Sequence, residues 1–529
     1  MKIFLILFIC IEPNLKKDPN LKKYRKYFGV PSTGKNIFEL QPVIIDSSPN
    51  QYTLWETAHD PICVNYNLIG IAYRRREPSH PGTGWIGYAY SNNGTTWIRS
   101  PIINPLTGED YPGRYPHSCI TPSYCVSTWS VPISGVWGRE AGNSMSRSTG
   151  NWNIDRLLSI NLGISYATPL YLPDGNILVL GSGYDEQNNI GFTYAQKFNP
   201  ANMQPVDSIR PVISLSEGIY AGSDIDGNKI AVFYKAPGGI FEGEQVLMAR
   251  SLDGGNTWEG PLLVGKLPPD TMWMEGNWLY YCWYQFWVGG EGIFLPDGTP
   301  VFFGVGEMWG TMTDTSTGIT LPIYGGGNIY MLKGGTCVNL TNDSDIDTPI
   351  LRCHVGVSIN RSANIISIVW QELTQIDVNI GYGYWDIFGM SSFNGGNTWT
   401  EKIQITNTPL FNDNLPHVAR NIWENSLHII YGTSYNGVND LVYESESQNE
   451  IKIKIFYLKT GIPGYKVEEK IVLDDKYRKY EKNMFRKIEF KLNKKWEIIN
   501  IAGQKLKNPK EGVYFLNFRN KYKKILILP

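Results

Sequence analysis

The stretch SLDGGNTW, from Ser251 to Trp258, recurs almost letter for letter as SFNGGNTW, from Ser392 to Trp399. A copy one residue shorter, SNNGTTW, ends at Trp97, and a degraded copy, SRSTGNW, ends at Trp152. In such a stretch the Asp or Asn side chain can accept hydrogen bonds from backbone N–H groups, and Gly can adopt a positive φ. The Trp side chain then packs under the turn. The repeat therefore predicts a tight hairpin that occurs several times in one chain.

A longer repeat surrounds these turns. A strand, a short turn and a second apolar strand recur in the same order, for example at 166–172 and 177–180. The second strands are predicted to begin at intervals of 53 to 71 residues, near Leu68, Tyr124, Ile177, Ile230, Val301, Ile366 and Leu427. Units of this length with four short strands are typical of propeller blades. Seven units can be counted, and six is the alternative because the unit at 105–160 is the least regular.

The composition agrees with an all-β chain. Aromatic residues make up 13% and charged residues 18%, and 54 Gly and 32 Pro separate many short apolar runs. No long stripe of helical period appears. We therefore predict a six- or seven-bladed β-propeller followed by a small C-terminal β-sandwich. The short repeats resemble the Asp-box, or bacterial neuraminidase repeat, of sialidase-like propellers. That resemblance implies a fold, since the role of the Asp-box is structural.

The last segment of the chain differs from the propeller repeats. Trp496 to Leu506, Glu511 to Phe515 and Lys523 to Ile527 predict three strands with tight turns. Their order resembles the sorting domain of the type IX secretion system, which implies secretion machinery as a partner. A plain β-sandwich appendage is the alternative. From Ile451 onward the chain holds 21 Lys and Arg against 8 Asp and Glu, so the remainder is acidic. An acidic body argues against nucleic acid as the main ligand.

The N-terminus begins with Met1 and Lys2, followed by an apolar run that ends at Cys10. This pattern indicates a secretory signal, and the run is too short to span a bilayer. The expected organisation is a leader at 1–25, a propeller at 40–460 and a sorting domain at 465–529. The expected location is outside a bacterial cell or on its outer-membrane surface.

Four of the six histidines fall near the predicted start of a first strand: His59, His117, His354 and His417. A ring of imidazoles at a channel mouth could bind a metal or move protons. The alternative is that each hydrogen-bonds a neighbouring loop. Sialidases carry an arginine on the first strand of the first blade, where this chain has His59-Asp60-Pro61. Their acid/base Asp is also missing from the loop 74–80, although Arg75 or Arg76 could match another sialidase arginine.

The same first blade resembles the start of arabinanase- and fructanase-type propellers, in which the Asp before Pro is a catalytic carboxylate. That resemblance implies Asp60 as one catalytic group. Glycoside hydrolysis uses two carboxyl groups, and Glu275 or Glu291 could supply the second. Burial near aromatic residues would raise the pKa of either one toward the role of an acid. The alternative is that Asp60 caps a turn before Pro61.

The stretch from Met272 to Trp287 holds eight aromatic residues in sixteen positions. Aromatic faces stack on sugar rings, so an aromatic insertion at a propeller mouth suits a glycan. Core packing between blades is the alternative. Arg420 also lies near a predicted first strand. The candidate substrate-binding residues are His59, Arg75, Arg76, Arg114, His117, Trp273, Trp278, Trp283, Arg352, His354 and His417.

No phosphate loop, metal-protease motif, nucleophile elbow or cofactor fingerprint is present, and the seven cysteines show no metal-ligand spacing. No cofactor or metal is expected. Turns rich in Asp and Asn could bind calcium, but no EF-type loop occurs. The chain is thus expected to be an exported, sialidase-like propeller that acts on or binds extracellular glycans, and a glycoside hydrolase if it is an enzyme. The alternative is a non-catalytic propeller that binds glycan or protein, and a surface-layer component is a third reading.

Overall fold

The computed structural model describes a propeller unit and a small C-terminal unit, which divide the chain into Met1–Tyr465 and Lys466–Pro529. The described residues are 42–48, 54, 60–77, 80–104, 113–133, 136–152, 164–185, 190–214, 219–223, 227–236, 242–377, 382–408, 411–435, 453–464, 497–499, 512–518 and 521–527. The predicted leader at 1–25 lies outside them. Over these residues the chain forms strands and turns, and no helix there could cross a membrane.

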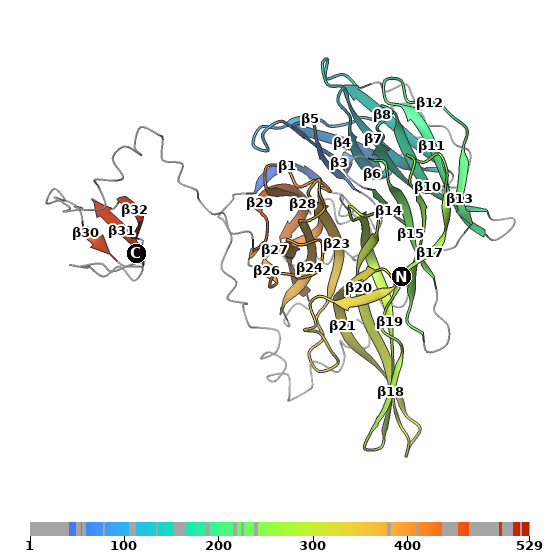
Figure 1. Cartoon of the computed structure of the whole chain (residues 1–529), viewed down its shortest axis with the longest axis vertical. Helices are drawn as coiled ribbons and strands as arrows, with labels where there is room; N and C mark the ends of the chain where they lie inside the picture. The colour runs from blue at the N-terminus through green and yellow to red at the C-terminus, as the bar shows by residue number, and fades with distance from the viewer. Residues whose placement is uncertain are drawn as a thin grey trace. The chain divides into compact units, whose positions relative to one another are not determined.

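The first four blades follow one another along the chain (Figure 1). The first contains β2 (Ile62–Asn65), β3 (Leu68–Glu77), β4 (His80–Ser91) and β5 (Ile98–Ser100). The second contains β6 (Arg114–Ile120), β7 (Tyr124–Ile133) and β8 (Val136–Ser146). The third contains β9 (Ile164–Tyr171), β10 (Ile177–Asp185) and β11 (Ile190–Asn199), with β12 (Gln204–Pro205) and β13 (Arg210–Ser214) both paired to β11. The fourth contains β14 (Ile219–Ser223), β15 (Ile230–Ala236), β16 (Gln245–Ser251) and β17 (Glu259–Lys266).

Three further blades complete the propeller. The fifth contains β19 (Trp278–Phe294), β20 (Pro300–Asp314), β21 (Thr320–Lys333) and β22 (Thr336–Asn339), and β18 (Thr271–Glu275) pairs with β19. The sixth contains β23 (Arg352–Ile359), β24 (Ile366–Asp377), β25 (Tyr382–Ser392) and β26 (Ile403–Gln404). The seventh contains β27 (Phe411–Val418), β28 (Ser426–Tyr435), β29 (Ile453–Gly461) and β1 (Val43–Ser48).

The N-terminal strand β1 closes the ring, because it pairs antiparallel with β29 as the outer strand of the seventh blade. Each pair of neighbouring blades also shares one apolar core cluster. The cluster between the seventh and first blades, for example, joins Ile430 and Tyr457 to Ile69 and Tyr73. The described strands therefore form seven blades. The irregular unit at 105–160 is a true blade, and beyond β8 its described residues add a bridge between Met145 and Trp152.

The core clusters form because successive apolar side chains of a strand point to opposite faces of its blade. In β20, Val301 and Phe303 pack against the sixth blade, and Phe302 packs on the fourth blade. Successive residues of a strand point to opposite faces, so each blade needs apolar residues on both. This explains why the second strands of the blades were recognisable as short apolar runs. The predicted starting points agree with β3, β7, β10, β15 and β24 to the residue.

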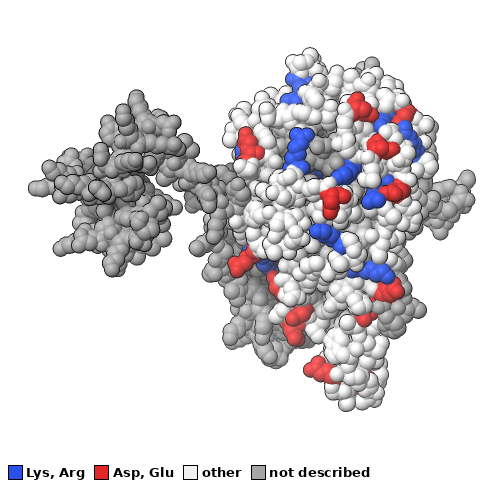
Figure 2. Space-filling model, viewed as in Figure 1, with Lys and Arg blue, Asp and Glu red and all other residues white. Residues whose placement is uncertain are grey.

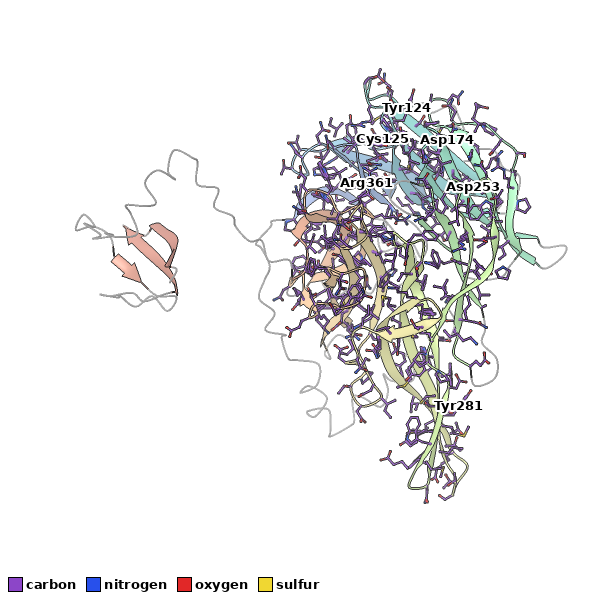
Figure 3. The ribbon with its side chains drawn as sticks, viewed as in Figure 1. Tyr124, Cys125, Asp174, Asp253, Tyr281 and Arg361 are labelled. Carbon is purple, nitrogen blue, oxygen red and sulfur yellow. The ribbon has the colours of Figure 1, made fainter. Side chains whose placement is uncertain are left out.

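The repeated turns form the tight hairpins that were predicted. In the turn from Ser251 to Trp258, the Asp253 carboxylate accepts hydrogen bonds from the Thr257 N–H at 2.9 Å and the Ser251 hydroxyl at 2.8 Å. Gly255 has φ of +84°, and a Cβ there would lie 2.9 Å from Leu178. The turns that end at Trp97 and Trp399 have the same hydrogen bonds. Figure 3 labels Asp253 and Asp174 in the upper part of the propeller unit.

The fifth blade is extended by a long β-sheet. Its strands β19, β20 and β21 have 17, 15 and 14 residues, and β18 pairs along the far half of β19. These strands project beyond the other blades (Figure 1). We call this projection the arm: residues 271–286, 308–314 and 320–324, with the turns between them.

One feature differs from the expectation. The first strand of the seventh blade begins at Phe411, earlier than the predicted start at His417, because the polar run Asn412-Asp413-Asn414 is buried in it. A polar run has the composition of a loop, which concealed the strand. Cys119 and Cys125, on either side of one turn, contact the third and first blades respectively. The cysteines that the structure describes are free thiols.

The C-terminal unit contains β30 (Glu497–Ile499), β31 (Gly512–Phe518) and β32 (Lys521–Ile527). They form one antiparallel sheet in that order, with Glu497 opposite Asn517 and Gly512 opposite Ile527. These are the three strands expected from the sequence.

Candidate functional site

The innermost strands of three blades share one backbone irregularity. Tyr115, His354 and Leu415 have φ of 58°, 55° and 54°, and the pairing with the second strand is interrupted at each of them. Such φ values are uncommon for residues other than Gly and tend to occur at functional sites. The bulge turns the Leu415 N–H away from the ladder, where it donates to Gln371 Oε1 at 2.6 Å. The bulges therefore redirect both backbone and side chains on the inner strands.

Two histidines follow these bulges at the same spacing, in Tyr115-Pro116-His117 and Leu415-Pro416-His417. His117 is fully buried, and His417 Nε2 lies 3.0 Å from the Leu54 carbonyl oxygen. A carbonyl can only accept, so Nε2 of His417 carries a proton. Burial lowers the pKa of His417 to about 4. Burial also lowers the pKa of His117 well below its usual value, with His417 as the second cause. Both imidazoles are thus neutral at neutral pH.

Charges from three blades meet at Arg420, which lies just beyond β27. Arg420 Nη2 lies 2.9 Å from Asp60 Oδ2 and 3.1 Å from Glu291 Oε1. Asp60 comes directly before β2, and Glu291 lies on the inner part of β19. Glu291 Oε2 accepts a hydrogen bond from the Val357 N–H of the sixth blade at 2.6 Å. We call Asp60, Glu291 and Arg420 the central cluster. The structure thus brings together Asp60 and Glu291, two of the three candidate catalytic residues.

Burial controls the protonation of the central cluster. It raises the pKa of Asp60, which Arg420 opposes. It raises the pKa of Glu291 to about 8, with the nearby Asp60 charge adding to the shift and Arg420 again opposing it. Two carboxyl groups that share one cation titrate as a pair. At neutral pH the arrangement therefore favours one proton and one negative charge on the pair, beside the Arg420 cation.

Backbone contacts tie this cluster into the ring. The Asp60 carbonyl accepts the Ser118 N–H of the second blade at 2.9 Å, and the Arg420 carbonyl accepts the Ile359 N–H of the sixth at 2.7 Å. Asn421 Nδ2 donates to the Val64 carbonyl of the first blade at 3.0 Å. Five of the seven blades thus contribute atoms to this region, which makes it a structural junction as well as a candidate site.

Other candidates lie in different places. Arg352 is buried between the fifth and sixth blades, where it contacts Glu372 at 2.8 Å, Asp343 at 2.6 Å and the Gly327 carbonyl at 2.6 Å. Arg75 Nε lies 3.3 Å from Asp46 Oδ2 of the seventh blade. Arg352 contacts Glu372 within the sixth blade and Gly327 of the fifth, and Arg75 joins the first and seventh blades. Neither arginine reaches the central cluster.

The arm holds the remaining aromatic and acidic candidates. Glu275 pairs with Trp278 at its turn and is exposed, so Glu275 does not join Asp60 and Glu291. Trp273 and Trp283 also lie on the arm. Arg114 and His354 are on inner strands, at the start of β6 and at the bulge of β23. His59 and the Arg76 side chain lie outside the described residues.

Among the buried acids that were not foreseen, three have a raised pKa. Glu307, where the arm joins the propeller, accepts from Tyr324 Oη at 2.7 Å and Trp309 Nε1 at 3.0 Å, and burial raises its pKa to about 7. Between the sixth and seventh blades, burial raises the pKa of Asp386 and raises that of Asp413 to about 6. In the sequence, each of these acids is marked only by being a charged residue within an apolar or polar run. The described residues include no cluster of His, Cys, Asp and Glu that could hold a metal ion.

No protein-family model matches the chain, and no curated protein matches it. Several solved structures resemble its fold. An ulvan lyase of polysaccharide lyase family PL25, bound to -[GlcA(1-4)Rha3S]-, is 11% identical with a TM-score of 0.50 and covers 80% of this chain and 96% of its own. Polysaccharide lyase Uly1 is 9% identical with a TM-score of 0.44, covering 81% and 93%. The Penicillium chrysogenum alpha-L-arabinanase complexed with arabinobiose is 9% identical with a TM-score of 0.35, covering 65% and 93%. At these identities the first similarity concerns the propeller fold alone.

Proposed function

We propose that this chain is a glycan-cleaving propeller, a glycoside hydrolase whose carboxyl groups are Asp60 and Glu291. The observation that carries the proposal is that two acids from the first and fifth blades meet at one nitrogen of Arg420. Their side chains retain 20% and 10% exposure, so solvent reaches the cluster. The names of the structures with a similar fold, an ulvan lyase and an arabinanase, agree with a glycan as substrate.

The chemistry requires one protonated and one ionised carboxyl group. Glu291, whose pKa is raised to about 8, would give its proton to the leaving oxygen as the glycosidic C–O bond breaks. Asp60, whose negative charge pairs with Arg420, would take the proton of the water that attacks the anomeric carbon. The new bond joins the water oxygen to that carbon, so protons and electrons balance.

A second candidate, a non-catalytic propeller that binds glycan, is favoured by a different observation. Both oxygens of Glu291 already accept hydrogen bonds, one from Arg420 and the other from the Val357 N–H. A proton on Glu291 must compete with these donors. If the donors prevail, the cluster holds the ring together and takes no part in chemistry, and the glycan binds elsewhere on the propeller.

The deciding experiment is product release by the purified full chain from sialosides, arabinosides, fructosides and polymeric glycans. The variants are Asp60→Asn and Glu291→Gln. Glu372→Gln is the matched control, because Glu372 is also a buried acid paired with a buried arginine, Arg352. The hydrolase proposal predicts that both cluster variants lose at least 100-fold in kcat while the control keeps its activity. If the chain shows no turnover but still binds glycan, the hydrolase proposal is rejected in favour of the non-catalytic binding function.

We also propose that the repeated turns are Asp-boxes of a sialidase-like propeller, and that the chain is exported to the bacterial surface through a type IX sorting domain at 465–529. The turn geometry supports the first part through the shared hydrogen bonds of Asp253, Asn394 and Asn93. The test of the second part is cell fractionation of the source bacterium with mass spectrometry of the mature ends. A chain found intact in the cytoplasm would contradict export.

A further inference from the structure

The arm exposes apolar side chains on both faces of its sheet. Met272 and Met274 on one face are 55% and 54% exposed, and Leu321 on the other is 40% exposed. An antiparallel sheet of a soluble protein commonly packs one face on a core and turns a polar face to water. Here neither face is covered by the described part of the chain. Large exposed apolar surface of this kind marks a binding site.

Two aromatic rings stack on each other at one edge of the arm. Trp273 of β18 lies opposite Tyr280 of β19, and their rings stack with centroids 4.9 Å apart and planes inclined by 4°. Met312 and Leu321 continue the same row across β20 and β21. Since β18 is the last strand of the sheet, no strand among the described residues follows it on its outer side. The outer face of the Trp273 ring is therefore available to a flat apolar ligand.

The opposite face repeats this composition. Tyr281 and Trp283 have ring centroids 5.6 Å apart, and the Tyr281 hydroxyl donates to Asp270 at 2.6 Å. Figure 3 labels Tyr281 on the arm, well below Asp253.

The small number of charged residues on the arm indicates which class of ligand it can bind. Residues 271–286 and 308–324 contain two charged side chains, Glu275 and Asp314, and no Lys or Arg. Figure 2 shows the projecting end of the arm almost entirely uncharged. Anionic polymers and lipid headgroups are bound through basic residues, which the arm lacks. Instead, hydroxyl and amide side chains accompany the aromatic rings: Thr271, Asn277, Thr311, Thr313, Thr315, Ser316, Thr317 and Thr320.

Strand β19 connects the arm to the central cluster, since it carries both Tyr280 and Glu291. Eleven residues of extended strand separate them, which corresponds to roughly 35 Å. A ligand held on the arm and reaching the cluster must therefore be a chain of several sugar units. A mono- or disaccharide is too short to span both.

We propose that the arm is a binding site for an uncharged polysaccharide, with sugar rings stacked on the aromatic pair Trp273 and Tyr280. The proposal rests on the proposed action on glycans and deepens it: the arm binds the polymer, and the central cluster acts on one of its bonds. The flat apolar faces of the sugars contact the rings, and their hydroxyl groups exchange hydrogen bonds with the neutral polar side chains.

The test is affinity gel electrophoresis of the full chain in gels that contain arabinan, galactan, xylan or polygalacturonate. We expect retardation by at least one of the three uncharged polymers and none by polygalacturonate. Trp273→Ala combined with Tyr280→Ala should weaken that retardation at least tenfold in Kd. Met272→Ala is the matched control, because it removes an exposed apolar side chain from the other face. The control should bind as the wild type does.

A turnover assay on a short chromogenic glycoside keeps the two proposals apart. Turnover of the short glycoside by the wild type, together with polymer binding that the double variant loses, supports both the arm site and the central cluster. Polymer binding that depends on the arm, in a chain without turnover, keeps the arm site and rejects the hydrolase. Equal retardation of the wild type and the double variant rejects the arm site. Retardation by polygalacturonate alone, or binding to phosphatidylcholine vesicles in place of polysaccharide, rejects it as well.

Discussion

The central cluster and the arm reverse the usual distribution of polar and apolar groups in opposite ways. In the cluster, Asp60, Glu291 and Arg420 place charges inside the ring of blades. On the arm, Met272 and Met274 place apolar side chains in water. Buried charges are tolerated only when they are paired and hydrogen-bonded, and exposed apolar surface persists where a ligand covers it. The two regions therefore differ in what offsets their unfavourable groups. In the central cluster the buried charges are offset by ion pairs and hydrogen bonds within the chain. On the arm the exposed apolar side chains would be covered by a ligand from outside the chain.

The largest expected loss of stability comes from removing the cation of the central cluster. Arg420→Met leaves Asp60 and Glu291 buried without a cation, and breaking a buried pair in this way costs about 3–5 kcal/mol of unfolding free energy. Urea denaturation measures it. The control Arg250→Met removes a surface pair with Glu259 and should cost under about 1 kcal/mol. A loss below about 1 kcal/mol for Arg420→Met would show that the cluster is not a structural junction.

A combined variant sharpens this result. Arg420→Met with Asp60→Asn and Glu291→Gln removes all three charges together. Because no unpaired charge then stays buried, we expect the combined variant to be more stable than Arg420→Met alone. If it is less stable, the loss in the single variant arises from packing of the Arg420 side chain and not from charge.

The second expected effect is a change in how the unfolding free energy depends on pH. Burial raises the pKa of Glu291 from 4.5 to about 8, so the folded chain binds a proton that the unfolded chain releases. This contribution to stability is complete below about pH 4.5 and is lost as the pH rises through 8. We expect Glu291→Gln to remove that loss, so its unfolding free energy should fall less than that of the wild type between pH 5 and pH 8. Urea denaturation at the two pH values, with exposed Glu275→Gln as control, tests this; equal slopes contradict it.

The third effect is the cost of one repeated turn, far from both regions. Asp253→Ala removes an acceptor used by the Thr257 N–H and the Ser251 hydroxyl, and the turn is exposed. Such a change costs about 1 kcal/mol, since water partly replaces the lost partner. The lowered pKa of Asp253, about 2, has the hydrogen bonds from Thr257 as its main stabilising cause. Thermal unfolding measures the loss, and the isosteric Asp253→Asn should retain most of the stability, as Asn394 does in the sixth blade.

The smallest expected effect on stability belongs to the arm. Trp273→Ala changes a partly exposed ring, so we expect a loss within about 0.5 kcal/mol. Trp370→Ala is the contrasting variant, because Trp370 is 0% exposed in the core of the sixth blade, and removing a buried Trp costs about 3–5 kcal/mol. Urea denaturation compares the two. A similar loss for both would mean that the arm is a packed core element and would remove the reason for assigning it a ligand.

Much of the fold was predictable because it depends on neighbours along the chain. The apolar runs that begin at Leu68, Tyr124 and Ile177 are the second strands of their blades, and the Asp253 turn has the expected hydrogen bonds. Asp60 was a candidate through the resemblance of the first blade to arabinanase- and fructanase-type propellers, and Glu291 was one of two possible partners for it. The bulges at Tyr115 and Leu415 were not foreseen, because a positive φ at a residue other than Gly leaves no mark in composition.

By itself, the sequence determined an all-β chain of repeated four-stranded units with tight Asp and Asn turns, since strand period and turn chemistry are local properties. Only the tertiary structure decided that there are seven blades, because β1 closes the last one across the whole length of the propeller. It also decided that Arg420 meets Glu291, 129 residues away, and that Glu275 stands apart on the arm. Charges from distant blades affect one another only once the ring is closed, when burial removes the water that would otherwise screen them.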